Sequence, residues 1–125
     1  MARRIDNKMG TNTQLAHIGN DPREFYGFVN PPVVHASTVL YPDAATMVSR
    51  KQKYVYGTRG TPTSDALCSA IDHLEGSAGT VAVPSGLVAV TLPLLAFLSA
   101  GDHVLITDSV YHPTRNFADT ILKRL

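Results

Sequence analysis

The sequence predicts an α/β fold in which a parallel-rich sheet is layered against helices. After Pro62 the chain alternates between two kinds of apolar run. Residues 80–83 and 103–107 are short runs rich in apolar and β-branched side chains, which is typical of buried strands. Residues 87–98, between them, are long and apolar enough for a buried helix. The resulting order of helix, strand, helix, strand and helix indicates a parallel sheet.

The first sixty residues are polar and irregular, and we expect an extended N-terminal arm there. Short helical turns are expected near residues 14–18 and 43–47. Two adjacent prolines precede residues 33–40, whose mostly β-branched side chains favour an extended chain. Residues 51–63 contain two glycines and a proline, so we expect a loop. The arm therefore leads into a more regular region that starts at residue 61.

The helices of that second region have recognisable ends. Thr63 or Ser64 can cap the first helix, and Gly76 suits its C-terminal stop. The next helix contains Pro93, which is expected to kink it. The pattern predicts a last helix over residues 114–125.

Composition excludes several classes of function. The chain has 125 residues, 44% of them hydrophobic, and a formal net charge of +1, so no strong field attracts nucleic acid or an anionic membrane. Cys68 is the one cysteine, and the five histidines have no metal-site spacing, so no metal is expected. The basic start lacks the apolar core of a signal peptide, which favours a cytoplasmic protein. Prolines interrupt the uncharged residues 76–101, favouring a buried sheet over a membrane span.

The segment from Ser85 to Leu87 is a candidate anion site. It joins a predicted buried strand to a predicted helix, whose first N–H groups lack internal partners and carry the positive end of the helix dipole. Gly86 lets an anion approach the backbone closely, so the turn could hold a phosphate or a carboxylate. The alternative is that Ser85 only caps the helix and Gly86 only relieves the turn. The sequence contains no G-x-G-x-x-G motif after a strand, which binds dinucleotides, and no G-x-x-x-x-G-K-[ST] motif, which binds nucleoside triphosphates.

Tyr111 is a second candidate site residue. Residues 108–113 follow the second predicted strand, and ligands bind at the carboxyl edge of parallel sheets. A tyrosine there could stack its ring on an aromatic ligand. The alternative is an ordinary exposed loop tyrosine.

Several motifs, in order and spacing, resemble one enzyme family. From about Asn12 to the end, the chain is similar to the N-terminal part of the Cys/Met-metabolism (trans-sulfuration) family of enzymes that depend on pyridoxal 5'-phosphate (PLP). The matching runs are Val29-Asn30-Pro31-Pro32-Val33, Ala36-Ser37-Thr38-Val39, Tyr56-Gly57-Thr58-Arg59-Gly60-Thr61-Pro62-Thr63, Leu74-Glu75-Gly76, Pro84-Ser85-Gly86-Leu87, and Gly101-Asp102-His103 through Asp108-Ser109-Val110-Tyr111. The resemblance implies part of a fold type I, aspartate-aminotransferase-like large domain, with residues 1–60 as arm and neighbour-subunit cofactor loop and 61–125 as the start of the PLP-binding domain.

The resemblance also assigns roles to single residues. It implies that the backbone amides of Gly86 and Leu87, with Ser85 beside them, hold the cofactor phosphate. Leucine replaces the usual methionine, which a backbone donor tolerates. Tyr111 would stack over the pyridine ring and help to activate the substrate amine, as the catalytic residue.

One part of the family's phosphate site departs from the usual pattern. The family's Tyr-x-Arg clamp comes from the neighbouring subunit and would begin at Tyr56. The position two residues later is Thr58, and Arg59 follows it. Either Arg59 reaches the phosphate from a shifted backbone, or Thr58 supplies a weaker hydrogen bond.

The implied activity is that of a PLP-dependent carbon–sulfur lyase. It would eliminate the β-thiolate of cystathionine to give homocysteine, pyruvate and ammonia in methionine biosynthesis, in a homo-oligomer (a dimer of dimers). γ-Synthase, γ-lyase and sulfhydrylase members share the motifs, and a non-catalytic phosphate-binding or oligomerisation remnant is the alternative from another class. The Schiff-base lysine and the aspartate that pairs with the pyridine nitrogen are expected beyond Leu125. We therefore expect this chain alone to be an inactive N-terminal fragment.

Overall fold

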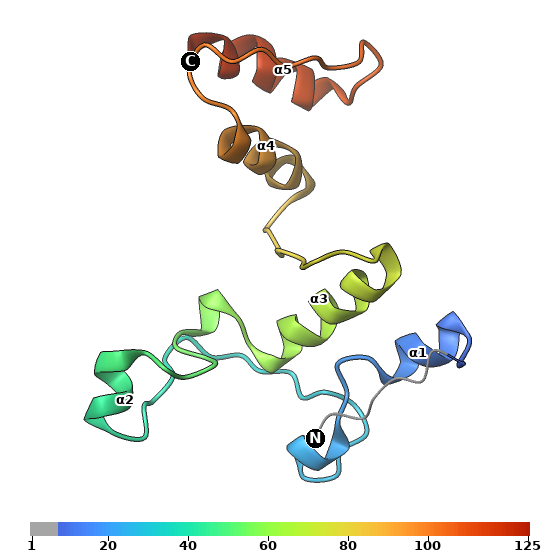
Figure 1. The fold of residues 1–125 in the computed structure, drawn as a ribbon, viewed down its shortest axis with the longest axis vertical. Coiled ribbons are helices and arrows are strands. Elements are labelled where there is room, and N and C mark those ends of the chain that lie inside the picture. The colour runs from blue at the N-terminus through green and yellow to red at the C-terminus, as the bar shows by residue number, and fades with distance from the viewer. Residues whose placement is uncertain (1–7) are drawn as a thin grey trace. The chain divides into compact units, whose positions relative to one another are not determined.

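A computed structural model describes residues 8–125, so the basic start of the chain lies outside the described residues. The chain divides into two compact units, Met1–Ala82 and Val83–Leu125. Figure 1 shows helices and connecting segments in both units. The first unit contains, in order, α1 (Thr11–His17), the 3-10 helix η1 (Pro22–Phe25), α2 (Ala44–Ser49), the 3-10 helix η2 (Gly57–Arg59) and α3 (Pro62–Glu75).

Helix α3 begins earlier than the sequence predicted. Its N-cap is Thr61, whose hydroxyl accepts the N–H of Ser64 at 3.2 Å, while the Ser64 hydroxyl accepts the N–H of Thr61 at 2.8 Å. The predicted caps, Thr63 and Ser64, are therefore wrong, because Pro62 fits the first helical position and moves the cap to the residue before it. The predicted stop is confirmed, since Gly76 ends α3 in the left-handed conformation at φ +61°.

The arm is attached to α3 by side-chain hydrogen bonds. The Thr63 hydroxyl donates to the Pro32 carbonyl at 2.7 Å and accepts the Val34 N–H at 2.9 Å. Gly19 lies so close to the helix that an added Cβ would be 2.5 Å from the Ala66 Cα. Parts of the chain before α3, at residues 19 and 32–34, thus lie against this helix.

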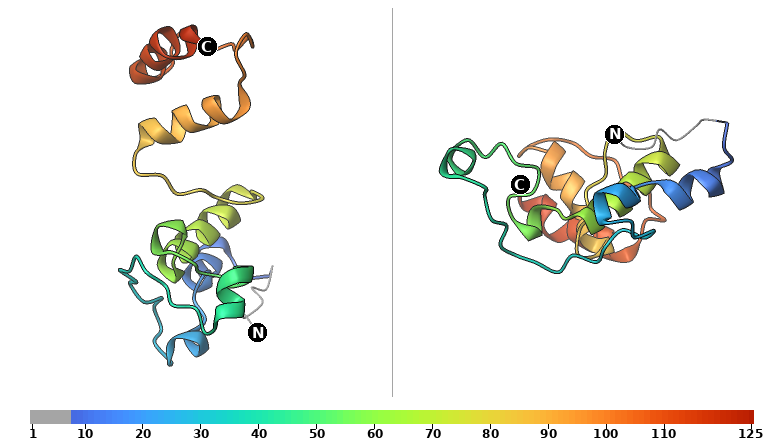
Figure 2. Two further views of the ribbon diagram at one scale, coloured as in Figure 1. Left: turned by 90° about the vertical axis from the view of Figure 1, so that its left-hand side faces the viewer. Right: turned by 90° about the horizontal axis from the view of Figure 1, so that it is seen from below.

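The second unit contains α4 (Gly86–Phe97), α5 (His112–Thr120) and the 3-10 helix η3 (Leu122–Arg124), coloured from orange to red in Figure 2. Helices α4 and α5 contact each other. The helix predicted over 87–98 is confirmed, and Pro93 lies inside it. The helix predicted over 114–125 begins two residues earlier and changes to a 3-10 helix near its end.

The two predicted strands do not form in this structure. Residues 80–83 and 103–107 are neither helix nor strand, and the one strand pairing within the described residues is an isolated antiparallel bridge between Thr38 and Tyr56. A strand needs a neighbour to satisfy its backbone N–H and C=O groups, and neither segment has one among residues 8–125. The predicted parallel sheet is therefore absent from this part of the chain.

The apolar side chains of the described residues lie at the surface. None of the hydrophobic residues there is buried, and the predicted burial of α4 is wrong, since Phe97 is 85% exposed. Val81 and Leu105, in the predicted strands, are 78% and 88% exposed. Without a sheet there is no opposite layer for these side chains to pack against. Within residues 8–125, no helix has both the length and the apolar character needed to cross a membrane.

Candidate functional site

The start of α4 offers backbone donors to an anion. The Ser85 hydroxyl accepts the N–H of Val88 at 3.3 Å, and its carbonyl accepts the N–H of Ala89 at 3.0 Å. The N–H groups of Gly86 and Leu87 precede the first helical hydrogen bond, so they have no acceptor inside the helix. An added Cβ at Gly86 would meet nothing within 4 Å, so the space beside this residue is open. The donor set therefore fits a phosphate, with the proton of the Ser85 hydroxyl still available.

Tyr111 lies at another helix start in the same unit. It is the N-cap of α5, where its carbonyl accepts the N–H groups of Thr114 at 2.9 Å and Arg115 at 3.3 Å. Its side chain makes no capping hydrogen bond, and the residue is 66% exposed. The phenol hydroxyl of Tyr111 therefore takes no part in capping α5. An adjacent ion pair between Arg115 and Asp108, at 2.7 Å, ties α5 to the loop before it.

Tyr56 and Arg59 lie at and just after the point where a loop is closed at its base. The bridge between Thr38 and Tyr56 joins the two ends of the loop, and the Gly57 N–H donates to the Ser37 carbonyl at 2.7 Å. Tyr56 is the N-cap of η2, and Arg59 is the last residue of this 3-10 helix. The structure thus brings Tyr56 and Arg59 onto one short element.

Tyr56 and Arg59 line the same cavity, and Thr58 does not. That cavity has a volume of about 450 Å³, and its lining also includes Tyr41 and Arg50. Thr58 lines a different cavity of about 630 Å³, which Arg59 also borders. The two residues that the sequence left as alternatives for the clamp therefore differ in their surroundings, because only Arg59 shares a cavity with Tyr56.

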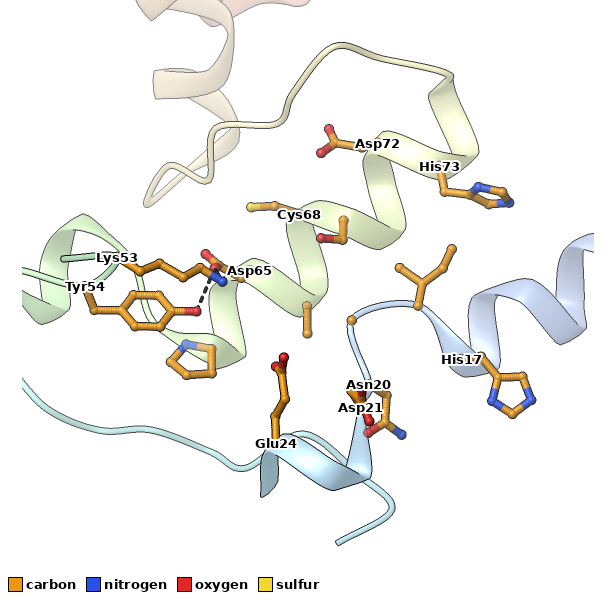
Figure 3. A pocket seen from close by; sticks show the side chains of 15 residues that line it. His17, Asn20, Asp21, Glu24, Lys53, Tyr54, Asp65, Cys68, Asp72 and His73 are labelled. Carbon is orange, nitrogen blue, oxygen red and sulfur yellow. Dashed lines mark hydrogen bonds and ion pairs between the residues drawn. The ribbon is translucent and has the colours of Figure 1, made fainter. Parts of the chain in front are cut away.

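A charged cluster not predicted from the sequence lies at the start of α3. The Lys53 ammonium is 2.8 Å from Asp65 Oδ2, and the Tyr54 hydroxyl donates to the same oxygen at 2.7 Å (Figure 3). Lys53 Nζ also lies 4.9 Å from the centre of the Tyr54 ring. These groups border a cavity of about 590 Å³ that Glu24 and Asp72 also line. The cluster connects the loop before η2 to α3.

The pKa values in this cluster shift in the directions that its contacts dictate. The hydrogen bond from Lys53, and then that from Tyr54, lowers the pKa of Asp65 below 3.8. The bond to Asp65, and then the contact with Tyr54, raises the pKa of Lys53 above 10.5. Desolvation by burial raises the pKa of the Tyr54 hydroxyl. All three groups therefore keep their ordinary protonation states at neutral pH.

The predicted site residues are divided between the two units of the chain. Ser85, Gly86, Leu87 and Tyr111 belong to the second unit, and Tyr56 and Arg59 to the first. Sequence reasoning missed Arg50, whose link to Tyr56 is a shared cavity rather than a motif. The basic run from Arg50 to Lys53 was the one signal that could have drawn attention to it.

Comparison with known proteins identifies relatives along nearly the whole chain. Residues 12–125 match the family model described as Cys/Met metabolism PLP-dependent enzyme. A "putative cystathionine beta-lyase" of Rhizobium johnstonii is 71% identical over 93% of this chain, and the match covers 29% of that protein. Cystathionine beta-lyase MetC of Escherichia coli is 37% identical over 90% of this chain and 30% of that protein. The chain thus spans about three tenths of the length of these relatives.

Solved structures agree with the sequence comparison. The crystal structure of metB from Corynebacterium glutamicum matches with a TM-score of 0.84 and 28% identity, covering 96% of this chain and 31% of that one. Cystathionine gamma-lyase from Lactobacillus plantarum matches with a TM-score of 0.77 and 30% identity, covering 93% of this chain and 29% of that one. Both the sequence and the backbone therefore show that this chain belongs to the Cys/Met-metabolism family of PLP-dependent enzymes.

Proposed function

We propose that the protein is a PLP-dependent carbon–sulfur lyase that cleaves cystathionine by β-elimination. The reaction consumes water and gives homocysteine, pyruvate and ammonia. The support comes from family membership and from relatives named cystathionine beta-lyase, one of them 71% identical over 116 residues. The fold type I architecture is proposed on the same basis, with solved relatives matching 93–96% of the chain.

The start of α4 is the observation that carries the assignment of the cofactor. Gly86 and Leu87 offer N–H groups without helical acceptors, the helix dipole places partial positive charge beside them, and open space lies at Gly86. We therefore assign these two N–H groups and the Ser85 hydroxyl to the cofactor phosphate. When bound, PLP supplies a ring that withdraws the electrons released as the substrate loses its α-proton.

Tyr111 is assigned to the cofactor ring and to the substrate. Its exposed, uncommitted side chain suits stacking on a planar ring, and its hydroxyl can orient the substrate amine through a hydrogen bond. Tyr56 and Arg59 are assigned to the phosphate held by a neighbouring subunit. A hydroxyl and a guanidinium on one short element suit a dianion. This assignment makes the protein a homo-oligomer, and we propose a dimer of dimers.

A product assay of the whole protein, loaded with PLP, tests the proposal. Pyruvate and homocysteine formed from cystathionine support β-elimination. α-Ketobutyrate would instead point to a γ-lyase. If PLP does not bind, or no elimination product forms, the lyase assignment fails and a non-catalytic role replaces it.

A further inference from the structure

We propose that Arg50 is a further anion-binding residue of the cavity that contains Tyr56 and Arg59. Its ligand is one oxyanion, either a phosphate monoester or a carboxylate. The inference deepens the proposed function and rests on it, because the ligand in that enzyme is the cofactor phosphate or a substrate carboxylate.

The closed loop explains how Arg50 comes to lie in this cavity. Its two ends are joined at Thr38 and Tyr56, and inside them the Gln52 amide donates to the Leu40 carbonyl at 3.2 Å and the Tyr54 carbonyl at 2.7 Å. Helix α2 lies in the sequence between Leu40 and Gln52, and Arg50 is its C-cap residue. The loop therefore returns Arg50 toward Tyr56, nine residues before Arg59 in the sequence.

The charges around the cavity are unbalanced. Its lining consists of Tyr41, Met47, Val48, Arg50, Val55, Tyr56 and Arg59, with no acidic residue. Within residues 8–125, neither Arg50 nor Arg59 has an ion pair or a hydrogen-bonded side-chain partner. The acidic residue beside α2, Asp43, already accepts the Thr46 N–H at 2.7 Å as the helix cap. Two arginines that line one space without an acidic residue are a donor set that binds phosphate and carboxylate oxygens.

The backbone at Arg50 supports a role for its side chain. Arg50 has φ +51° and ψ +26°, the left-handed conformation that glycine and asparagine adopt most easily at the end of a helix. An arginine here is a poor choice for the turn alone. Backbone strain of this kind is typical of residues whose side chains have a task.

Arg50 also bears on the absence of an arginine at residue 58. The resemblance noted in the sequence implies an arginine two residues after Tyr56, whereas this chain has Thr58, which does not line the cavity of Tyr56. Arg50 and Arg59 together then supply the positive charge that the usual clamp provides.

Three variants of the whole protein test the inference. Arg50→Gly removes the guanidinium and keeps the left-handed backbone without strain, so the turn is preserved. Arg50→Lys keeps the charge, and Lys51→Ala removes a neighbouring cation that does not line the cavity. For each variant we would measure the dissociation constant of PLP for the apo-protein, competition by inorganic phosphate, and the KM for cystathionine. We expect Arg50→Gly to weaken anion binding about 10- to 100-fold, Arg50→Lys to restore part of it, and Lys51→Ala to match the wild type.

Each outcome has a defined meaning. Weaker binding of PLP and of inorganic phosphate identifies the phosphate as the ligand, whereas a raised KM with unchanged PLP binding identifies a substrate carboxylate. The inference is overturned if Arg50→Gly behaves like Lys51→Ala in all three measurements. If the wild type binds no PLP, the proposed function fails, and binding of inorganic phosphate to wild type and Arg50→Gly still decides the role of Arg50.

Discussion

Replacement of Gly57 by alanine is the sharpest test of how the loop holds Tyr56. A Cβ at residue 57 would overlap the carbonyl oxygen of Ala36, lie 2.6 Å from its carbonyl carbon and lie 3.1 Å from the Ser37 Cα. Carbon atoms pack at about 3.5–4.0 Å, so the carbon contact alone requires the two backbones to separate by about 1 Å, and the overlap with the oxygen requires more. The N–H of residue 57 then loses its acceptor, the Ser37 carbonyl at 2.7 Å.

The magnitude follows from three contributions. The lost hydrogen bond costs about 0.5–1.5 kcal/mol, and the steric conflict costs about 1–3 kcal/mol. Replacing glycine by alanine also restricts the unfolded chain, which returns about 0.4–1 kcal/mol. The Gly57→Ala variant should therefore be destabilised by about 2 kcal/mol. Cofactor retention should fall as well, because the shift displaces Tyr56 and Arg59.

Gly79→Ala is the matched control, because an added Cβ there would meet nothing within 4 Å. We would compare both variants of the whole protein by urea unfolding, by hydrogen exchange at amide 57 and by PLP titration. The control should remain within about 0.5 kcal/mol of the wild type. The reasoning is refuted if Gly57→Ala matches Gly79→Ala in stability and amide 57 keeps its protection.

The remaining predictions concern the charged cluster, the cofactor ring and the clamp. Because the pKa of Asp65 is lowered, its pair with Lys53 should stabilise the fold above pH 3.8 and lose that effect as the pH falls through the lower folded pKa. The side chains are 40% and 71% exposed, so Asp65→Asn should cost no more than about 1 kcal/mol at neutral pH, and urea unfolding near pH 2 should show no difference. Tyr111→Ala should weaken PLP binding and lower kcat at least about tenfold, whereas unchanged kinetics and PLP titration would remove Tyr111 from the site. Thr58→Arg should leave PLP affinity equal or higher if Arg59 serves the clamp, and a large loss in the same titration would give Thr58 a role of its own.

The positions of the helices could be predicted because their signals are local. Gly76 ends α3, and the apolar run after Ser85 forms α4. The predicted caps, Thr63 and Ser64, lie two and three residues after the observed cap, because Pro62 suits the first position of a helix as well as a loop. A capping signal is reliable only when the residue after it is considered as well.

The candidate site was predictable to the extent that its donors belong to the backbone of one helix. The N-terminus of α4 exposes its N–H groups wherever the helix starts, so Gly86 and Leu87 could be identified from the chain alone. Arg50 and the contact between Asp65 and Lys53 could not, because each joins residues whose spacing follows no helical or strand period. Such contacts depend on how the loop from residue 38 to residue 57 closes.

The sequence by itself determined the family and the helical segments, and it predicted an anion-binding turn at Ser85. These properties depend on local spacing and on the order of motifs, and both are the same in every conformation of the chain. The tertiary structure decided that Arg59 rather than Thr58 shares a cavity with Tyr56, that Arg50 joins them, and that residues 80–83 and 103–107 form no strand among the described residues. The physical reason is that cavities and strands require partners from distant parts of a chain, and a linear pattern does not specify which partners meet.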